Sequence, residues 1–166
     1  MIKKVLVVGA GTMGQGIAQW FCQQGIDVQL TDINKDVLDN GISKVKDSWK
    51  KLCEKGKLSA KDVLVFSNHL SAGLESEIDP NVSLVIEAII EDLKIKKETF
   101  LRLDKLINPE AIFASNTSSI SINSLCEELK VHRKRNFLGL HFFNPVPIMK
   151  LVEIIQGKYT ETDLIE

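Results

Sequence analysis

A histidine and a glutamate twelve residues apart are the side chains of this sequence best suited to proton transfer. His141 lies in the strand-like run 137–142, and Glu153 lies inside the apolar run 151–155. Two prolines between the runs predict a turn that folds the second run back onto the first. Histidine exchanges protons near neutral pH, and a lone carboxylate is costly to bury without a partner. We therefore expect Glu153 to orient His141 as a base. The alternative is a buried structural histidine beside an edge-strand glutamate.

The first third of the chain carries a glycine-rich motif directly after the strand-like run 2–8. A motif that joins a strand to a helix in this way binds the pyrophosphate of a dinucleotide. Its first glycine permits a tight turn, its second lets the phosphates approach the backbone, and its third lets helix and strand pack closely. The alternative is an ordinary glycine-rich turn. The motif consists of Gly9, Ala10, Gly11, Thr12, Met13 and Gly14.

An aspartate identifies the expected dinucleotide. Asp32 ends a second strand-like run, 28–32, at the spacing of an acid that accepts hydrogen bonds from both ribose hydroxyls. This carboxylate would repel the 2′-phosphate of NADP, and residues 32–45 contain no arginine to receive that phosphate. We therefore predict that the cofactor is NAD.

Composition narrows the class of protein. The chain has 166 residues, 44% of them hydrophobic, which is enough for one core of ordinary size. A net charge of -1 gives no reason to expect nucleic-acid or anionic-membrane binding. No apolar stretch approaches the ~20 residues that span a bilayer, and the first strand begins too early for a signal or transit peptide. Three scattered cysteines lack metal-ligand spacing, so we expect reduced thiols, no metal site and a cytoplasmic location.

Strand-like and helical segments alternate along the rest of the chain, which favours a Rossmann-type α/β fold with a doubly wound, mostly parallel sheet. In such sheets ligands bind beyond the carboxyl ends of the strands. Further strands are expected at 63–66, 82–86, 111–114 and 137–142, and helices at 35–55, 93–107 and 122–129. The polar residues at the expected strand ends are Asp32, Glu87, Glu91, residues 116–119 and His141.

These motifs resemble the L-3-hydroxyacyl-CoA dehydrogenase family, in particular its short bacterial 3-hydroxybutyryl-CoA members. The resemblance covers essentially the whole chain and is carried by the glycine motif, residues 85–88, residues 113–119 and the block 139–153. It implies an NAD-binding domain at 1–157, followed at 158–166 by the start of a connecting helix. It also implies a C-terminal helical domain, absent from this chain, that makes the homodimer. We therefore expect a truncated piece or a separately encoded half, poorly active alone.

The resemblance also implies an activity and its residues. The activity is NAD-dependent oxidation of short (3S)-3-hydroxyacyl-CoA, such as 3-hydroxybutyryl-CoA, and its reverse, in fatty-acid or butanoate metabolism. His141 is implied as the general acid/base, Glu153 as its partner, and Ser118 as a hydrogen-bond donor near the substrate oxygen. Ser119 is a candidate cap of the following helix, and the residues alone do not decide between the two serines. NAD contacts are implied at Asp32, Glu91, Lys96, Ser118 and Asn144, and CoA contacts at Ser48, Lys55 and Ser118.

A basic segment fits the implied acyl-CoA substrate. Residues 44–61 hold seven lysines against two acidic residues, a local charge of +5 that suits the phosphates of CoA. Ser48, Lys51 and Lys55 would share one helix face; the alternative is a solvated lysine face.

Two other functions stay open. One is a related NAD-dependent sugar-acid 3-dehydrogenase, and the other is a non-catalytic NAD-binding module.

Overall fold

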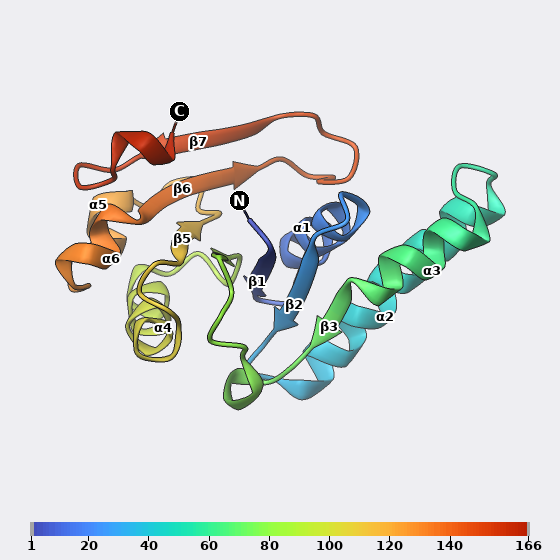
Figure 1. Ribbon diagram of the computed structural model, residues 1–166, viewed down its shortest axis with the longest axis horizontal. Helices are drawn as coiled ribbons and strands as arrows, with labels where there is room; N and C mark the ends of the chain where they lie inside the picture. Colours follow the sequence, from blue (N-terminus) through green and yellow to red (C-terminus); the bar gives the residue numbers. More distant parts are fainter. Residues whose placement is uncertain (1, 166) are drawn as a thin grey trace.

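Seven strands form one sheet among residues 2–165, the part of the chain that the computed structural model describes (Figure 1). The sheet order is β3-β2-β1-β4-β5-β6-β7; β1 to β6 run parallel, and β7 runs antiparallel to β6. The strand order reverses between β1 and β4, because the chain adds β2 and β3 on one side of β1 and the later strands on the other side. Ligands of such folds bind at this switch point. The predicted doubly wound, mostly parallel sheet is therefore confirmed. The strands are β1 Lys4–Val8, β2 Asp27–Thr31, β3 Leu70–Ala72, β4 Leu84–Glu87, β5 Ile112–Ser115, β6 Phe137–Phe142 and β7 Val152–Gln156.

Helices cover both faces of this sheet. In β1, Val5 and Val7 pack into the core with α1 and α2, whereas Leu6 and Val8 pack into the core with α4 and α5. Because successive side chains of a strand point to opposite faces, a strand covered on both sides reads as a continuous apolar run. The helices are α1 Thr12–Gln23, α2 Lys35–Glu54, α3 Ala60–Asn68, α4 Leu93–Leu106, α5 Ile122–Cys126 and α6 Val131–Arg135, with 3-10 helices η1 Glu75–Glu77 and η2 Thr162–Leu164.

Helices α2 and α3 lie side by side and project past β3, at the edge of the sheet (Figure 1). The prediction of a strand at 63–66 is wrong, because these residues belong to α3. A capping box between Ser59 and Asp62 begins the helix. Within it, Phe66 packs on Trp49 of α2, with ring centroids 5.9 Å apart, while Leu64 is exposed. The third strand is instead the short β3.

The structure describes the end of the chain up to residue 165, where the start of a connecting helix is predicted. Among the described residues, 158–165 contain only the 3-10 helix η2, and Glu166 lies outside them. The helix expected at 122–129 ends earlier, at Cys126. No helix within residues 2–165 is long and apolar enough to cross a membrane. The boundary between a dinucleotide-binding domain and a following domain stays a prediction.

Candidate active site

The turn after β1 has the geometry of a phosphate-binding loop. Gly9 has a φ of 102°, which favours glycine, and a Cβ there would lie 2.7 Å from the carbonyl oxygen of Ala88. A Cβ on Gly14 would lie 1.8 Å from the carbonyl oxygen of Gly9, so α1 packs directly against the turn. A Cβ on Gly11 would meet nothing within 4 Å. The backbone at Gly11 is thus open to a ligand.

The N-terminus of α1 adds donors to this loop. Gly11 is its N-cap, no side chain caps the helix, and its first turn contains no acidic residue. The first backbone N–H groups of such a helix attract phosphates. They border a cavity of about 690 Å³ that is lined by Gly9, Gly11, Thr12, Met13 and Asp32, together with apolar side chains such as Ile90 and Ile95. The cavity suits a dinucleotide.

Asp32 is held rigidly at the wall of this cavity. Its Oδ2 accepts a hydrogen bond of 2.9 Å from the backbone N–H of Ala10, and its Oδ1 accepts one of 3.1 Å from that of Asn34. The carboxylate is therefore fixed beside the glycine turn. It retains lone pairs for further donors such as ribose hydroxyls, and it offers no donor to a phosphate.

His141 and Glu153 face each other across β6 and β7. They are direct partners in the antiparallel register, and His141 Nδ1 lies 2.8 Å from Glu153 Oε2. The contact expected from the sequence is thus present. When Nδ1–H donates to this carboxylate, Nε2 remains free to accept a proton. The ring of Phe143 packs against the imidazole at 4.6 Å between centroids, which further restricts its orientation.

A cavity of about 320 Å³ lies beside this pair. His141, Glu153, Ser118 and Ser119 all line it, so the structure brings Ser118 to the candidate base. The interpretation of Ser119 as a helix cap is wrong, because Ser121 caps α5 by accepting from the N–H of Ser124 at 3.4 Å. The Ser119 hydroxyl instead donates to Glu91 Oε1 at 3.2 Å. Among the described residues, the Ser118 hydroxyl forms no hydrogen bond, and it is available to a substrate.

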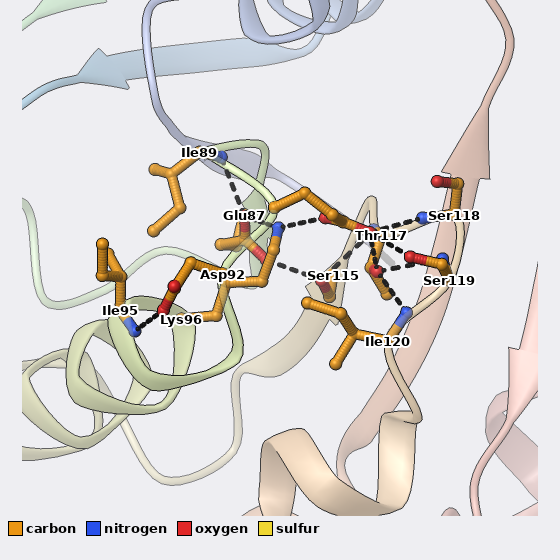
Figure 2. A network of polar contacts seen from close by, with 11 residues as sticks. Glu87, Ile89, Asp92, Ile95, Lys96, Ser115, Thr117, Ser118, Ser119 and Ile120 are labelled. Carbon is orange, nitrogen blue, oxygen red and sulfur yellow. Dashed lines mark hydrogen bonds and ion pairs between the residues drawn. The ribbon is translucent and has the colours of Figure 1, made fainter.

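A buried polar network connects β4, α4 and the segment after β5 (Figure 2). Glu87 is fully buried and accepts from Lys96 Nζ at 2.5 Å, Ser115 Oγ at 2.6 Å and the N–H of Ile89 at 2.8 Å. Lys96 Nζ also lies 3.1 Å from Glu91 Oε2. Buried charges are tolerated only when they are paired and hydrogen-bonded in this way. The network therefore fixes the position of Lys96.

Glu91 joins this network to the serine cluster. Its Oε1 accepts from the Thr117 hydroxyl, and from the N–H of Ser118 at 3.2 Å. Burial by itself would raise the pKa of Glu91, but hydrogen bonds from Thr117 and Lys96, with the charge of Lys96, outweigh it and lower the pKa below its usual range. Glu91 is thus held as a carboxylate beside Ser118.

The residues predicted to contact NAD and CoA lie around several cavities. Of the predicted NAD contacts, Asp32 and the glycine motif apart from Ala10 and Gly14 line the 690 Å³ cavity. Lys96 is buried in the polar network, and Glu91 lies at the exposed end of that network. Asn144 lines a neighbouring cavity of about 300 Å³ that shares Thr12 with the larger one. Ser48 borders both this cavity and a third of about 340 Å³ that also contains Lys51 and Lys55.

Three residues predicted only to lie at strand ends form hydrogen bonds that hold the site together. They are Glu87, Thr117 and Asn116, whose Oδ1 accepts from the N–H of Phe142 at 2.8 Å. Each follows or ends an apolar run, and this position was their only signal. Within residues 2–165, no group of three or more His, Cys, Asp or Glu side chains is placed to hold a metal ion.

Comparisons with known proteins agree with this geometry. Residues 4–166 match a family model described as the NAD-binding domain of 3-hydroxyacyl-CoA dehydrogenase. The chain is 43% identical over 158 residues to a Deinococcus radiodurans protein named "Probable 3-hydroxybutyryl-CoA dehydrogenase", covering 95% of this chain and 55% of that protein. It is 40% identical over 172 residues to human mitochondrial hydroxyacyl-coenzyme A dehydrogenase, covering 100% of this chain and 54% of that protein.

Solved structures give the same result. The crystal structure of (S)-3-hydroxybutyryl-CoA dehydrogenase from Ralstonia eutropha matches with a TM-score of 0.92 and 36% identity, covering 98% of this chain and 57% of that chain. A 3-hydroxybutyryl-CoA dehydrogenase from Escherichia coli matches with a TM-score of 0.94 and 35% identity, covering 99% of this chain and 34% of that chain. This chain therefore spans about half the length, or less, of the relatives that it matches.

Proposed function

Because the chain belongs to the 3-hydroxyacyl-CoA dehydrogenase family, through its NAD-binding domain, we propose that it interconverts (3S)-3-hydroxyacyl-CoA and 3-ketoacyl-CoA with NAD. Short substrates such as 3-hydroxybutyryl-CoA are proposed, which places the protein in fatty-acid or butanoate metabolism. The observation that carries the proposal is the contact between His141 and Glu153 beside the Ser118 cavity.

The residues for NAD fall into two groups. The glycine turn, the α1 N-terminus and Asp32 suit the pyrophosphate and the adenosine ribose. Glu91, Lys96, Ser118 and Asn144 are proposed for the nicotinamide half. This assignment is supported by the bonds that tie Glu91 and Lys96 to the Ser118 segment. NAD⁺, when bound, supplies the hydride acceptor.

His141 moves the proton in the proposed reaction. In the oxidative direction its Nε2 takes the proton of the 3-hydroxyl and the ring becomes an imidazolium. Glu153 keeps the proton on Nδ1 and stabilises this cation. In the reductive direction His141 returns the proton to the 3-keto oxygen. The Ser118 hydroxyl is proposed to donate a hydrogen bond to the same oxygen, since both side chains line one cavity.

The basic face of α2 is proposed to hold CoA. Ser48, Lys51 and Lys55 line one cavity, and Ser48 also borders the cavity that reaches Thr12 and Asn144. An extended ligand could therefore run from the lysines toward the cofactor site. We also propose a cytoplasmic location and a homodimer assembled through a helical domain of the kind that the resemblance implies.

The test is NADH oxidation with acetoacetyl-CoA by the full product of the gene, beside the 166-residue chain. We expect turnover by the full product and negligible turnover by the chain, because a substrate misplaced by ~1 Å can react about a hundredfold more slowly. A full product that oxidises sugar acids with NAD but ignores acetoacetyl-CoA would indicate a sugar-acid dehydrogenase. Binding of NADH without either activity would indicate a non-catalytic module.

A further inference from the structure

Strand β6 extends beyond the end of its parallel neighbour. The β5–β6 register pairs Phe113 with Phe137, Ala114 with Leu138, and Ser115 with Gly139, where β5 ends. Strand β6 continues to Phe142 and carries His141 in this extension. There the backbone pairs with β7 on one side only. The segment that holds the candidate base thus lacks a strand partner on its β5 side.

An asparagine side chain occupies that place. Asn116 follows β5 directly, and its Oδ1 accepts the N–H of Phe142 at 2.8 Å. Its own N–H donates to the carbonyl oxygen of Glu87, at 2.8 Å, and so anchors it to β4. Phe142 is 5% exposed, so without Asn116 its N–H would have no partner and little access to water, which destabilises the fold. The amide thereby extends the sheet by one hydrogen bond past the end of β5.

This bond joins the two sides of the candidate substrate cavity. Asn116 lies two residues before Ser118, and Phe142 directly follows His141. Ser118 and His141 line the same cavity from different elements. The hydrogen bond from the Phe142 N–H to Asn116 links their two segments just beyond the last β5–β6 pair, Ser115 with Gly139.

We infer that Asn116 is a positioning residue, which sets the separation between Ser118 and His141. The inference rests on the proposed function, in which both side chains contact the substrate's 3-oxygen. Asn116 lines none of the cavities assigned to substrate and cofactor, and it acts through the backbone of β6. A purely structural asparagine would affect folding and cofactor binding as much as turnover, whereas a positioning residue affects turnover selectively.

Two variants separate these roles in the full gene product. Asn116→Asp keeps an oxygen acceptor in the same place, and Asn116→Leu keeps a similar size without an acceptor. Asn108→Leu is the matched control, since its side chain accepts from the N–H of Glu110 at 2.9 Å in an exposed turn outside the cavity. We expect Asn116→Leu to lower kcat by about 10- to 100-fold, as a misplacement of ~1 Å would. The affinity for NADH should stay near wild type, Asn116→Asp should recover most of kcat, and the control should keep it.

Hydrogen exchange gives a readout that does not depend on activity. The Phe142 amide should be protected in wild type and in Asn116→Asp, and should exchange rapidly in Asn116→Leu. The inference is overturned if Asn116→Leu keeps its kcat, if Asn116→Asp and Asn116→Leu lower kcat equally, or if NADH affinity in Asn116→Leu falls as much as kcat. An inactive wild type would defeat the proposed function alone. In that case, a Phe142 amide that stays protected from exchange in Asn116→Leu would overturn the positioning role as well. Loss of this protection, together with a shifted His141 NMR signal, would support the positioning role.

Discussion

Individual residues determine the chemistry that this domain can perform. His141 has one ring nitrogen engaged by Glu153, 2.8 Å away, and the other available to a substrate. We expect His141→Gln in the full gene product to lower kcat by about 10²–10⁴-fold, the usual contribution of a general acid/base. NADH affinity should remain nearly intact, because the ring lies outside the 690 Å³ cavity. Steady-state kinetics with fluorescence titration of NADH separates the two effects, and near-normal turnover would eliminate His141 as the acid/base.

Glu153 provides a finer test of the same pair. Glu153→Gln keeps a hydrogen-bond acceptor but removes the charge that stabilises the imidazolium. We expect a lower kcat together with a displaced pH–rate profile, since the imidazolium formed during turnover loses its counter-charge. Lys150→Gln is a control that changes an exposed charge near the same hairpin. A profile identical to wild type in Glu153→Gln would mean that Glu153 does not tune the base.

The lowered pKa of Glu91 predicts a pH-dependent stability. A carboxyl whose pKa is lower in the folded than in the unfolded state stabilises the fold above its unfolded pKa, and this contribution is lost as the pH falls through the folded pKa. Glu91→Gln should therefore be less stable than wild type near neutral pH. The difference should shrink as the pH falls below about 4, since unfolded Glu titrates near 4.3. Urea denaturation at a series of pH values measures it, and a difference independent of pH would contradict the stated cause.

The geometry of a single helix determines which of its side chains line the same cavity, as α2 shows for the proposed CoA site. Lys51 and Lys55 share a cavity, whereas Lys50, one position away, does not line it. We expect Lys55→Ala to raise the KM for acetoacetyl-CoA by about 2- to 5-fold, the effect of losing an exposed ion pair worth ~0.5–1 kcal/mol. The effect should weaken at high salt. Lys50→Ala is the matched control, and equal KM values for the two variants would indicate a solvated lysine face.

Elements also show what the sequence could and could not predict. The β1–α1 unit was predictable because a strand, a glycine turn and an apolar-periodic helix each leave a local signal. The prediction of a strand at 63–66 was wrong because the β-branched residues of this segment favour strands. The capping residue Ser59, which begins the helix, lies four residues before the segment and leaves no signal within it. The contact of Glu87 with Lys96 and Ser115 unites β4, α4 and β5. No local sequence pattern predicts this contact, because it forms only when the strands and the helix are assembled around the sheet.

In the whole molecule, these sites lie together at the carboxyl ends of the parallel strands. The glycine turn, Asp32, Glu87, the serine cluster and His141 all lie at or beyond the carboxyl ends of parallel strands, where the winding of this fold opens a crevice. This location was predictable because alternation of strands and helices implies a parallel sheet. The division of the site into connected cavities was not, since it depends on side chains from α2 and from the loop after β6.

We expect Asp32 to make this domain selective for NAD by excluding the 2′-phosphate of NADP. Calorimetric titration of the 166-residue chain with NADH and NADPH tests it most directly. We predict tighter binding of NADH, and in Asp32→Ala a loss of NADH affinity of about 1–3 kcal/mol, the cost of hydrogen bonds to a charged group. Asp36→Ala, an exposed aspartate in the first turn of α2, should bind like wild type. Equal affinities of the wild-type chain for NADH and NADPH would contradict the claim.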